Sequence, residues 1–275
     1  MLKQRILSAV IAVPLLCVLI VWSPVSLFSA VLLGLALWAA WEWTHLVRFE
    51  TLQRWGFLGL VLAALLALYL SAPRPQLLFW ICAGALFCWL AGFGLVFAFS
   101  WFQQRAFSRL VRQLSCFIVG LVLILPFVVG IYSLKSAGRE DMLLFLLFLI
   151  WIADSAAYFG GRSLGRHRLA PVVSPGKTWE GFVCSALAGG VFGMLAMGWL
   201  HVSIAVAGWV ALVVFIVVVS ALGDLFESGI KRLMGVKDSG RGLPGHGGIL
   251  DRIDSLTAAV PFFVVGYSVL LNGVA

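Results

Sequence analysis

The chain has 275 residues, of which 63% are hydrophobic and only 11% are charged. Because a soluble domain of this size carries roughly 25% charged residues, this composition excludes a water-soluble globular protein. A chain that must satisfy its backbone inside a bilayer forms either a helix bundle or a closed barrel. The apolar runs are continuous and do not alternate with polar residues, which favours helices. The sequence therefore predicts an all-α, polytopic transmembrane helix bundle.

Windows of about 20 apolar residues predict about nine membrane spans. In chain order they lie near residues 6–23, 25–41, 56–72, 77–101, 114–134, 142–160, 182–200, 203–222 and 255–272. The first has the basic start and apolar core of a signal peptide, but no small-residue cleavage site follows it, so we expect a retained helix.

This pattern divides the chain into two regions. Residues 1–150 hold the first five spans and most of the sixth. Residues 151–275 hold two long polar connections, 161–181 and 223–254, and we expect this region to carry the functional site.

The positions of the basic residues predict the orientation. With the N-terminus inside, all but three of the 19 Lys and Arg residues fall on the inner side, the exceptions being Arg74, Lys135 and Arg139. We therefore expect a cytoplasmic N-terminus, with both polar connections on the cytoplasmic side. This bias accounts for most of the net charge of +8, so nucleic-acid binding has no support. The five cysteines lie in or next to apolar spans and lack metal-type spacing.

A polar stripe follows the eighth predicted span. If this helix continues to about residue 232, four polar residues at spacing i, i+3, i+4 and i+7 share one face: Asp224, Glu227, Ser228 and Lys231. The opposite face is apolar, which favours a stripe that faces protein or a cavity. A solvated helix end is the alternative.

A second acidic group, Asp251 and Asp254, comes just before the last span. Simple capping of that helix is one explanation, since acids favour first turns. Two helix ends that each carry an inward carboxylate also suit a hard cation such as Mg²⁺, together with phosphate oxygens and water. The two acidic groups are therefore candidates for a Mg²⁺ site. An ion-pair cluster with Lys231 and Arg252 is the structural alternative.

A basic glycine-rich segment joins the two acidic groups. Five glycines occur within residues 240–248, and Lys237 precedes them. Glycine permits close backbone approach, and exposed N–H groups form anion-binding nests. This indicates a polyphosphate cradle that includes Gly247 and Gly248. His246 is a candidate for phosphate contact or for an acid, and a structural turn is nearly as good an explanation.

Asp154, at the inner end of the sixth span, is a further candidate because ionisable groups in membrane spans are usually functional. The connection after it contains Ser174-Pro175-Gly176-Lys177-Thr178-Trp179-Glu180-Gly181. This segment is not a Walker A motif, because the upstream glycine and strand context are missing. Lys177 is a candidate phosphate ligand. Alternatively, Ser174 or Thr178 caps the seventh span and Lys177 is only a topogenic charge.

These segments combine into one long pattern. It comprises Ser228-x-x-Lys231-Arg232, then Lys237-Asp238, then Leu243-Pro244-x-His246-Gly247-Gly248-x-x-Asp251-Arg252-x-Asp254. The pattern resembles the signature of the phosphatidate cytidylyltransferase family, also called CDP-diacylglycerol synthases. Residues 174–181 and 154–158 are similar to two further family segments, although many members have Gly at the position of Ala156. The resemblance covers roughly residues 150–261, and before it mainly the span pattern and residues 39–43 match.

The resemblance implies transfer of a cytidylyl group from CTP to phosphatidic acid, giving CDP-diacylglycerol and pyrophosphate with Mg²⁺. It implies metal binding by Asp224 and Asp251 with K⁺ nearby, functional roles for Lys231 and Asp254, a homodimer, and a bacterial inner-membrane setting. We therefore take Asp224, Lys231, Asp251 and Asp254 as the catalytic set. The substrate-binding candidates are Asp154, Lys177, Ser228, Arg232, Lys237, His246, Gly247, Gly248 and Arg252.

Two other functions are kept as alternatives. A CTP-dependent polyprenol kinase uses the same nucleotide but transfers the γ-phosphate. A cation-coupled transporter also has membrane carboxylates, but its acids should lie near mid-membrane in both halves of the chain. Here they gather at one boundary of the C-terminal half.

Overall fold

The computed structural model describes residues 2–71, 74–97, 109–200, 202–240 and 247–272. Over these ranges it contains nine α-helices and one two-stranded sheet. The helices are α1 (Leu2–Trp22), α2 (Val25–Leu46), α3 (Thr51–Leu70), α4 (Pro75–Phe97), α6 (Arg109–Ser136), α7 (Glu140–Leu164), α8 (Trp179–Trp199), α9 (Val206–Leu233) and α10 (Leu250–Asn272). The predicted helical bundle is therefore confirmed.

Eight helices in the described ranges, all except α1, are long and apolar enough to cross a membrane. In α1 the described apolar stretch is the shorter segment Ala12–Trp22. Eight of the nine predicted spans thus coincide with helices of membrane-crossing length, and the first span stays a prediction.

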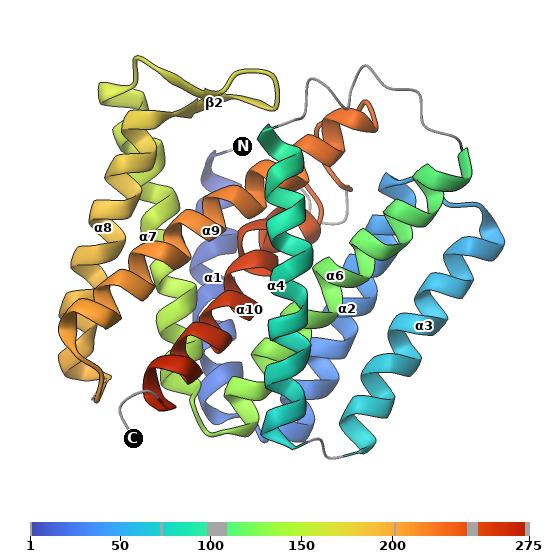
Figure 1. Cartoon of the computed structure of the whole chain (residues 1–275), viewed down its shortest axis with the longest axis horizontal. Coiled ribbons are helices and arrows are strands. Elements are labelled where there is room, and N and C mark those ends of the chain that lie inside the picture. Colours follow the sequence, from blue (N-terminus) through green and yellow to red (C-terminus); the bar gives the residue numbers. More distant parts are fainter. Residues whose placement is uncertain (1, 72–73, 98–108, 201, 241–246, 273–275) are drawn as a thin grey trace.

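Successive helices alternate in direction (Figure 1). The beginning of α1, the turn between α2 and α3, the hairpin after α7, the end of α9 and the beginning of α10 therefore lie at one end of the bundle. The end of α10 lies at the opposite end. We call the first of these the site end, because both polar connections of the sequence meet there.

The polar connections are shorter than the sequence analysis expected. Helix α7 continues to Leu164, α9 continues to Leu233, and α10 already begins at Leu250. The predicted boundaries 161–181 and 223–254 followed the loss of hydrophobicity. The helices continue past them because their polar side chains find partners, on neighbouring elements for α9 and α10 and within the same helix for α7.

A β-hairpin, which the all-α prediction did not include, joins α7 to α8. Strands β1 (Arg168–Ala170) and β2 (Ser174–Thr178) pair antiparallel, with Arg168 opposite Thr178. Thr178 is the N-cap of α8, and its hydroxyl accepts a hydrogen bond from the Gly181 N–H at 3.1 Å. Of the two predicted caps, Thr178 is therefore confirmed, while Ser174 begins β2.

Small residues allow the C-terminal helices to pack closely. A Cβ on Gly160 of α7 would collide with Cys184 of α8, and one on Gly193 of α8 would collide with Val213 of α9. Such close approach of backbones is typical of helix contacts in membranes. Trp209 of α9 is fully buried at the α8 contact, where its indole N–H donates to the Gly193 carbonyl at 2.8 Å. This packing holds the hairpin over the end of α9.

Candidate active site

The polar stripe of α9 lies on one helical face, as predicted, and most of it is buried. Glu227 is only 1% exposed and Lys231 only 6%. The Lys231 ammonium donates to Glu227 Oε1 at 3.3 Å, and the Ser228 hydroxyl donates to Asp224 Oδ1 at 3.2 Å. The alternative of a solvated helix end is therefore wrong for Glu227 and Lys231.

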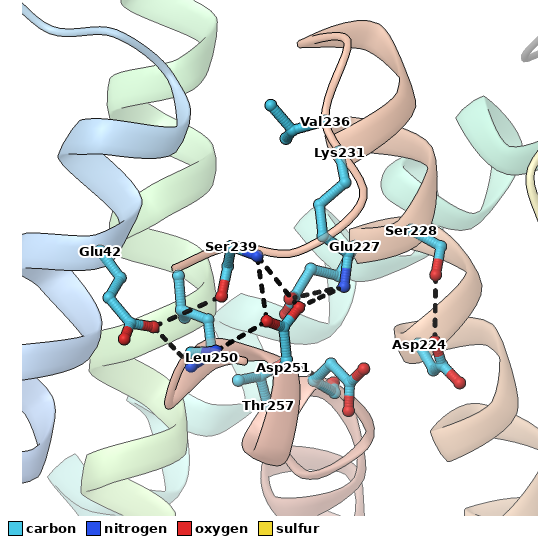
Figure 2. A network of polar contacts seen from close by, with 12 residues as sticks. Glu42, Asp224, Glu227, Ser228, Lys231, Val236, Ser239, Leu250, Asp251 and Thr257 are labelled. Carbon is cyan, nitrogen blue, oxygen red and sulfur yellow. Dashed lines mark hydrogen bonds and ion pairs between the residues drawn. The ribbon is translucent and has the colours of Figure 1, made fainter. Parts of the chain in front are cut away.

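Lys231 also joins α9 to α10 through an ion pair with Asp251. The distance from Lys231 Nζ to Asp251 Oδ1 is 2.7 Å, and the two side chains are 8% and 11% exposed. The Asp251 carboxylate further accepts from the backbone N–H groups of Ser239, at 3.0 and 3.2 Å, and of Gly248, at 2.9 Å. Asp251 thus ties the segment after α9 to the first turn of α10 (Figure 2).

A second lysine–aspartate pair connects the hairpin to α9. Lys177 Nζ of β2 lies 2.7 Å from Asp224 Oδ2, and it also donates to the Ala221 carbonyl at 3.4 Å. Lys177 therefore belongs to the same cluster as the polar stripe and is more than a topogenic charge. Asp154 of α7 is exposed and close enough to interact electrostatically with both Asp224 and Lys177.

Asp254 belongs to a cluster in which carboxylates outnumber basic side chains. Its Oδ1 accepts from the Ser255 N–H at 2.8 Å, and Asp224, Glu227 and Lys231 lie within electrostatic range of it. Among the described residues, the cluster contains five carboxylates and two lysines. These are Asp154, Asp224, Glu227, Asp251 and Asp254, with Lys177 and Lys231. Such an excess of negative charge at a partly buried site favours the binding of a cation.

Glu42 of α2 is a member of the site that is not among the residues predicted from the sequence. It is 5% exposed, and its Oε2 accepts from the Leu250 N–H at 3.1 Å and from the Ser239 hydroxyl at 3.4 Å. In Figure 2 it lies on the opposite side of Asp251 from Asp224. A glutamate inside a long apolar run was the available signal, but the sequence could not show that α2 reaches the start of α10.

Gly247 and Gly248, just before Asp251, occupy positions that a larger residue would not fit. Gly247 has a φ of +80°, which glycine adopts at little cost. A Cβ on Gly248 would collide with the carboxylate of Glu42. The Gly248 N–H donates to Asp251, and its role in an anion nest stays a prediction.

The remaining substrate-binding candidates lie around this cluster. Arg232 donates to the backbone carbonyls of Val173 and Val236, both at 3.3 Å, and so holds the hairpin and the segment after α9. Lys237 and Arg252 are exposed. His246 lies outside the described residues, as does most of the glycine-rich segment.

The carboxylates fit a metal ion that also takes ligands from a substrate. Within the described ranges, no three His, Cys, Asp or Glu side chains are placed to hold a metal by themselves. Mg²⁺, however, commonly takes only one or two carboxylates and completes its shell with phosphate oxygens and water. Among the described residues, the buried Oε2 of Glu227 has no hydrogen-bond partner. A cation that binds together with the substrate would supply a partner for this oxygen.

Comparison with known proteins shows the family to which the chain belongs. The model of the Cytidylyltransferase family matches residues 3–270. The chain belongs to the cytidylyltransferase family. The match includes every described element that supplies a residue to the site, from α2 to α10. The family resemblance of the C-terminal motifs is thereby confirmed and extends over nearly the whole chain.

Relatives from several bacteria carry the name phosphatidate cytidylyltransferase. The Haemophilus influenzae protein is 37% identical over 300 residues, which covers 98% of this chain and 100% of that protein. The Pseudomonas aeruginosa protein is 37% identical over 272 residues, covering 96% of each chain. A Staphylococcus epidermidis protein is 48% identical over 136 residues, covering 47% of this chain and 50% of that protein.

Proposed function

We propose that this protein transfers the cytidylyl group of CTP to phosphatidic acid, giving CDP-diacylglycerol and pyrophosphate for phospholipid biosynthesis. The observation that carries this proposal is the pairing of Lys177 with Asp224 and of Lys231 with Asp251, at 2.7 Å each, at one end of a membrane bundle. Two lysines and several carboxylates suit a reaction between two phosphate-bearing substrates. The family membership and the names of the full-length relatives support the same activity.

The chemistry requires no activated side-chain nucleophile. A phosphate oxygen of phosphatidic acid forms a bond to the α-phosphorus of CTP, while the bond from that phosphorus to the oxygen bridging to the β-phosphate breaks. Pyrophosphate leaves with the bridging oxygen. The protein has to hold two anions in line and stabilise the charge of the leaving group.

The residues of the cluster divide these tasks. Asp224 and Asp251 would hold Mg²⁺, which when bound supplies positive charge against the repulsion between the two substrates. Lys177 and Lys231 would exchange their aspartate partners for phosphate oxygens, with Arg252 as a further phosphate contact. Asp254 would orient a ligand or a second cation such as K⁺.

We further propose that the site end faces the cytoplasm of a bacterium, with the chain in the inner membrane and the N-terminus inside. The distribution of basic residues supports this orientation, and the bacterial relatives support the setting. A homodimer is proposed on the family resemblance alone. Cross-linking of the protein in native membranes tests the dimer, and accessibility of the site end to impermeant reagents tests the orientation.

The activity is tested with purified protein, phosphatidic acid, Mg²⁺ and CTP labelled at the α-phosphate. The proposal requires label in the lipid product and release of unlabelled pyrophosphate. Transfer of a γ-phosphate label to a polyprenol would instead identify a kinase. No lipid product from either substrate, together with cation-driven uptake in vesicles, would identify a transporter.

A further inference from the structure

The two lysine–aspartate pairs have the same length but differ in accessibility. In the pair of Lys231 and Asp251, the side chains are 8% and 11% exposed. In the pair of Lys177 and Asp224, each side chain is 28% exposed. One pair is therefore enclosed by protein and the other opens to the outside of the bundle.

The open pair borders an exposed face of α7. Asp154, Tyr158 and Arg162 follow one another at a spacing of four residues on this face, and all three are exposed. The Arg162 guanidinium donates to the Tyr158 hydroxyl at 3.2 Å. An ionisable group within a span normally faces protein or a water-accessible cavity. The position of Asp154 therefore indicates that this side of the bundle can accommodate the polar head of a ligand.

The elements next to the open pair also carry exposed, large apolar side chains. Phe159 of α7 is 66% exposed, and Trp179, at the start of α8, is 51% exposed and follows Lys177 by two positions. Aromatic residues near the ends of membrane helices are typical of the bilayer interface. The opening thus combines an ammonium group with apolar surface, which suits a ligand that has a phosphate head and hydrocarbon tails.

Described residues of several elements hold the enclosed pair. Lys231 is surrounded by Glu227 and Asp251, and backbone N–H groups of Ser239 and Gly248 bind the Asp251 carboxylate. Glu42 closes the far side by binding the first turn of α10. Asp251 binds both Lys231 and the Ser239 N–H, so a two-tailed lipid that reached Lys231 would have to break these contacts.

From this contrast we infer that the two lysines serve different substrates. Lys177 binds the phosphate of phosphatidic acid, which arrives from the bilayer along the exposed face of α7 and the start of α8. Lys231 is left for the phosphates of CTP. This inference rests on the proposed cytidylyl transfer and adds the lipid-binding residue and the side of approach.

The test is steady-state kinetics of Lys177→Ala in mixed micelles, with phosphatidic acid and CTP varied separately. We expect the KM for phosphatidic acid to rise roughly 10- to 100-fold, the effect of losing one charge-assisted hydrogen bond, while the KM for CTP changes by less than about threefold. Lys177→Arg should restore much of the lipid KM, because it keeps the charge and the donors. Arg166→Ala is the matched control, since Arg166 is an exposed cation in the same connection and should leave both constants unchanged.

If Lys177→Ala is inactive, measurements of ligand binding replace the kinetics. Native mass spectrometry measures retention of phosphatidic acid over diacylglycerol, and calorimetry measures CTP binding. Loss of the preference for phosphatidic acid with retained CTP binding supports the inference. An equal rise in both KM values, loss of CTP binding alone, or the same effect in Arg166→Ala overturns it. Absence of any cytidylyl product from the wild-type protein, with lipid binding still dependent on Lys177, would refute the proposed reaction and leave the lipid site standing.

Discussion

Glu42 should stabilise the site by fixing the start of α10, and Glu42→Ala tests this. The substitution removes the acceptor for the Leu250 N–H, at 3.1 Å, and leaves this buried donor without its present partner. A hydrogen bond to a charged acceptor contributes about 1.5–3 kcal/mol, and a carboxylate at a helix N-terminus adds roughly 0.3–1 kcal/mol. The second oxygen of Glu42 is buried without a hydrogen-bond partner among the described residues, and its desolvation offsets part of this gain. We therefore expect a net loss of about 2 kcal/mol in the free energy of unfolding.

The assay is thermal unfolding of the detergent-purified protein, followed with a thiol-reactive dye. Cys82 is fully buried and reports unfolding, whereas the exposed Cys88 sets the starting signal. At about 2–4 °C per kcal/mol for a chain of this size, Tm should fall by roughly 4–8 °C. Asp238→Ala is the control, because Asp238 is an exposed acid in the neighbouring segment and its loss should shift Tm by less than about 1 °C.

Glu42→Gln distinguishes the contribution of the hydrogen bond from that of the negative charge, since the amide oxygen can still accept from the Leu250 N–H. It should lose about half as much stability as Glu42→Ala. Equal Tm values for Glu42→Ala and Asp238→Ala would refute the reasoning, because they would mean that the contact between α2 and α10 contributes nothing. A large loss in Glu42→Gln with none in Glu42→Ala would refute it as well.

Three further predictions concern catalysis and packing. Asp224→Asn and Asp251→Asn should each abolish cytidylyl transfer while the protein still inserts and elutes as the wild type does, and normal activity in either variant would contradict the metal assignment. Gly248→Ala should lower both Tm and activity, by about 1–3 kcal/mol in stability, because its Cβ collides with Glu42. Gly84→Ala has open space around its Cβ and should leave Tm unchanged or slightly raised, so an equal loss in both variants would disprove a local cause. Removal of divalent cations with a chelator should stop the reaction, and added Mg²⁺ should restore it; turnover that persists in chelator would exclude a metal requirement.

The sequence was sufficient to predict the helical membrane bundle and most of its spans, because hydrocarbon leaves few ways to satisfy a backbone. It was less accurate about where helices end. The polar stripe of α9 was placed on the correct face by its spacing, yet the apolar window that ended the predicted span at residue 222 stops well before the end of the helix. Hydrophobicity falls at that residue, while the hydrogen-bonded helix continues to Leu233 since Lys231 and Asp224 find partners on α10 and the hairpin.

The hairpin was missed for a related reason. Its strands are short, contain Pro175 and Gly176, and carry no alternating pattern that would predict a sheet. The sequence could not show the partner of the Gly248 N–H either, because a glycine-rich segment has the same composition whether its N–H groups bind a ligand or a carboxylate of the same chain. In the structure, Asp251 accepts that hydrogen bond.

The sequence by itself determined which chemical groups are present at the site and on which helical face they stand, since the spacing of residues along one helix fixes their direction. Only the tertiary structure decided which groups meet. The partnership of Lys177 with Asp224, the enclosure of Lys231 by Asp251, and the reach of Glu42 to the first turn of α10 all join elements far apart in the chain. Their distances depend on how closely the helices pack, and that closeness is set by small side chains at several helix contacts together. The difference between the open and the enclosed lysine, on which the assignment of the two substrates rests, is a product of that packing.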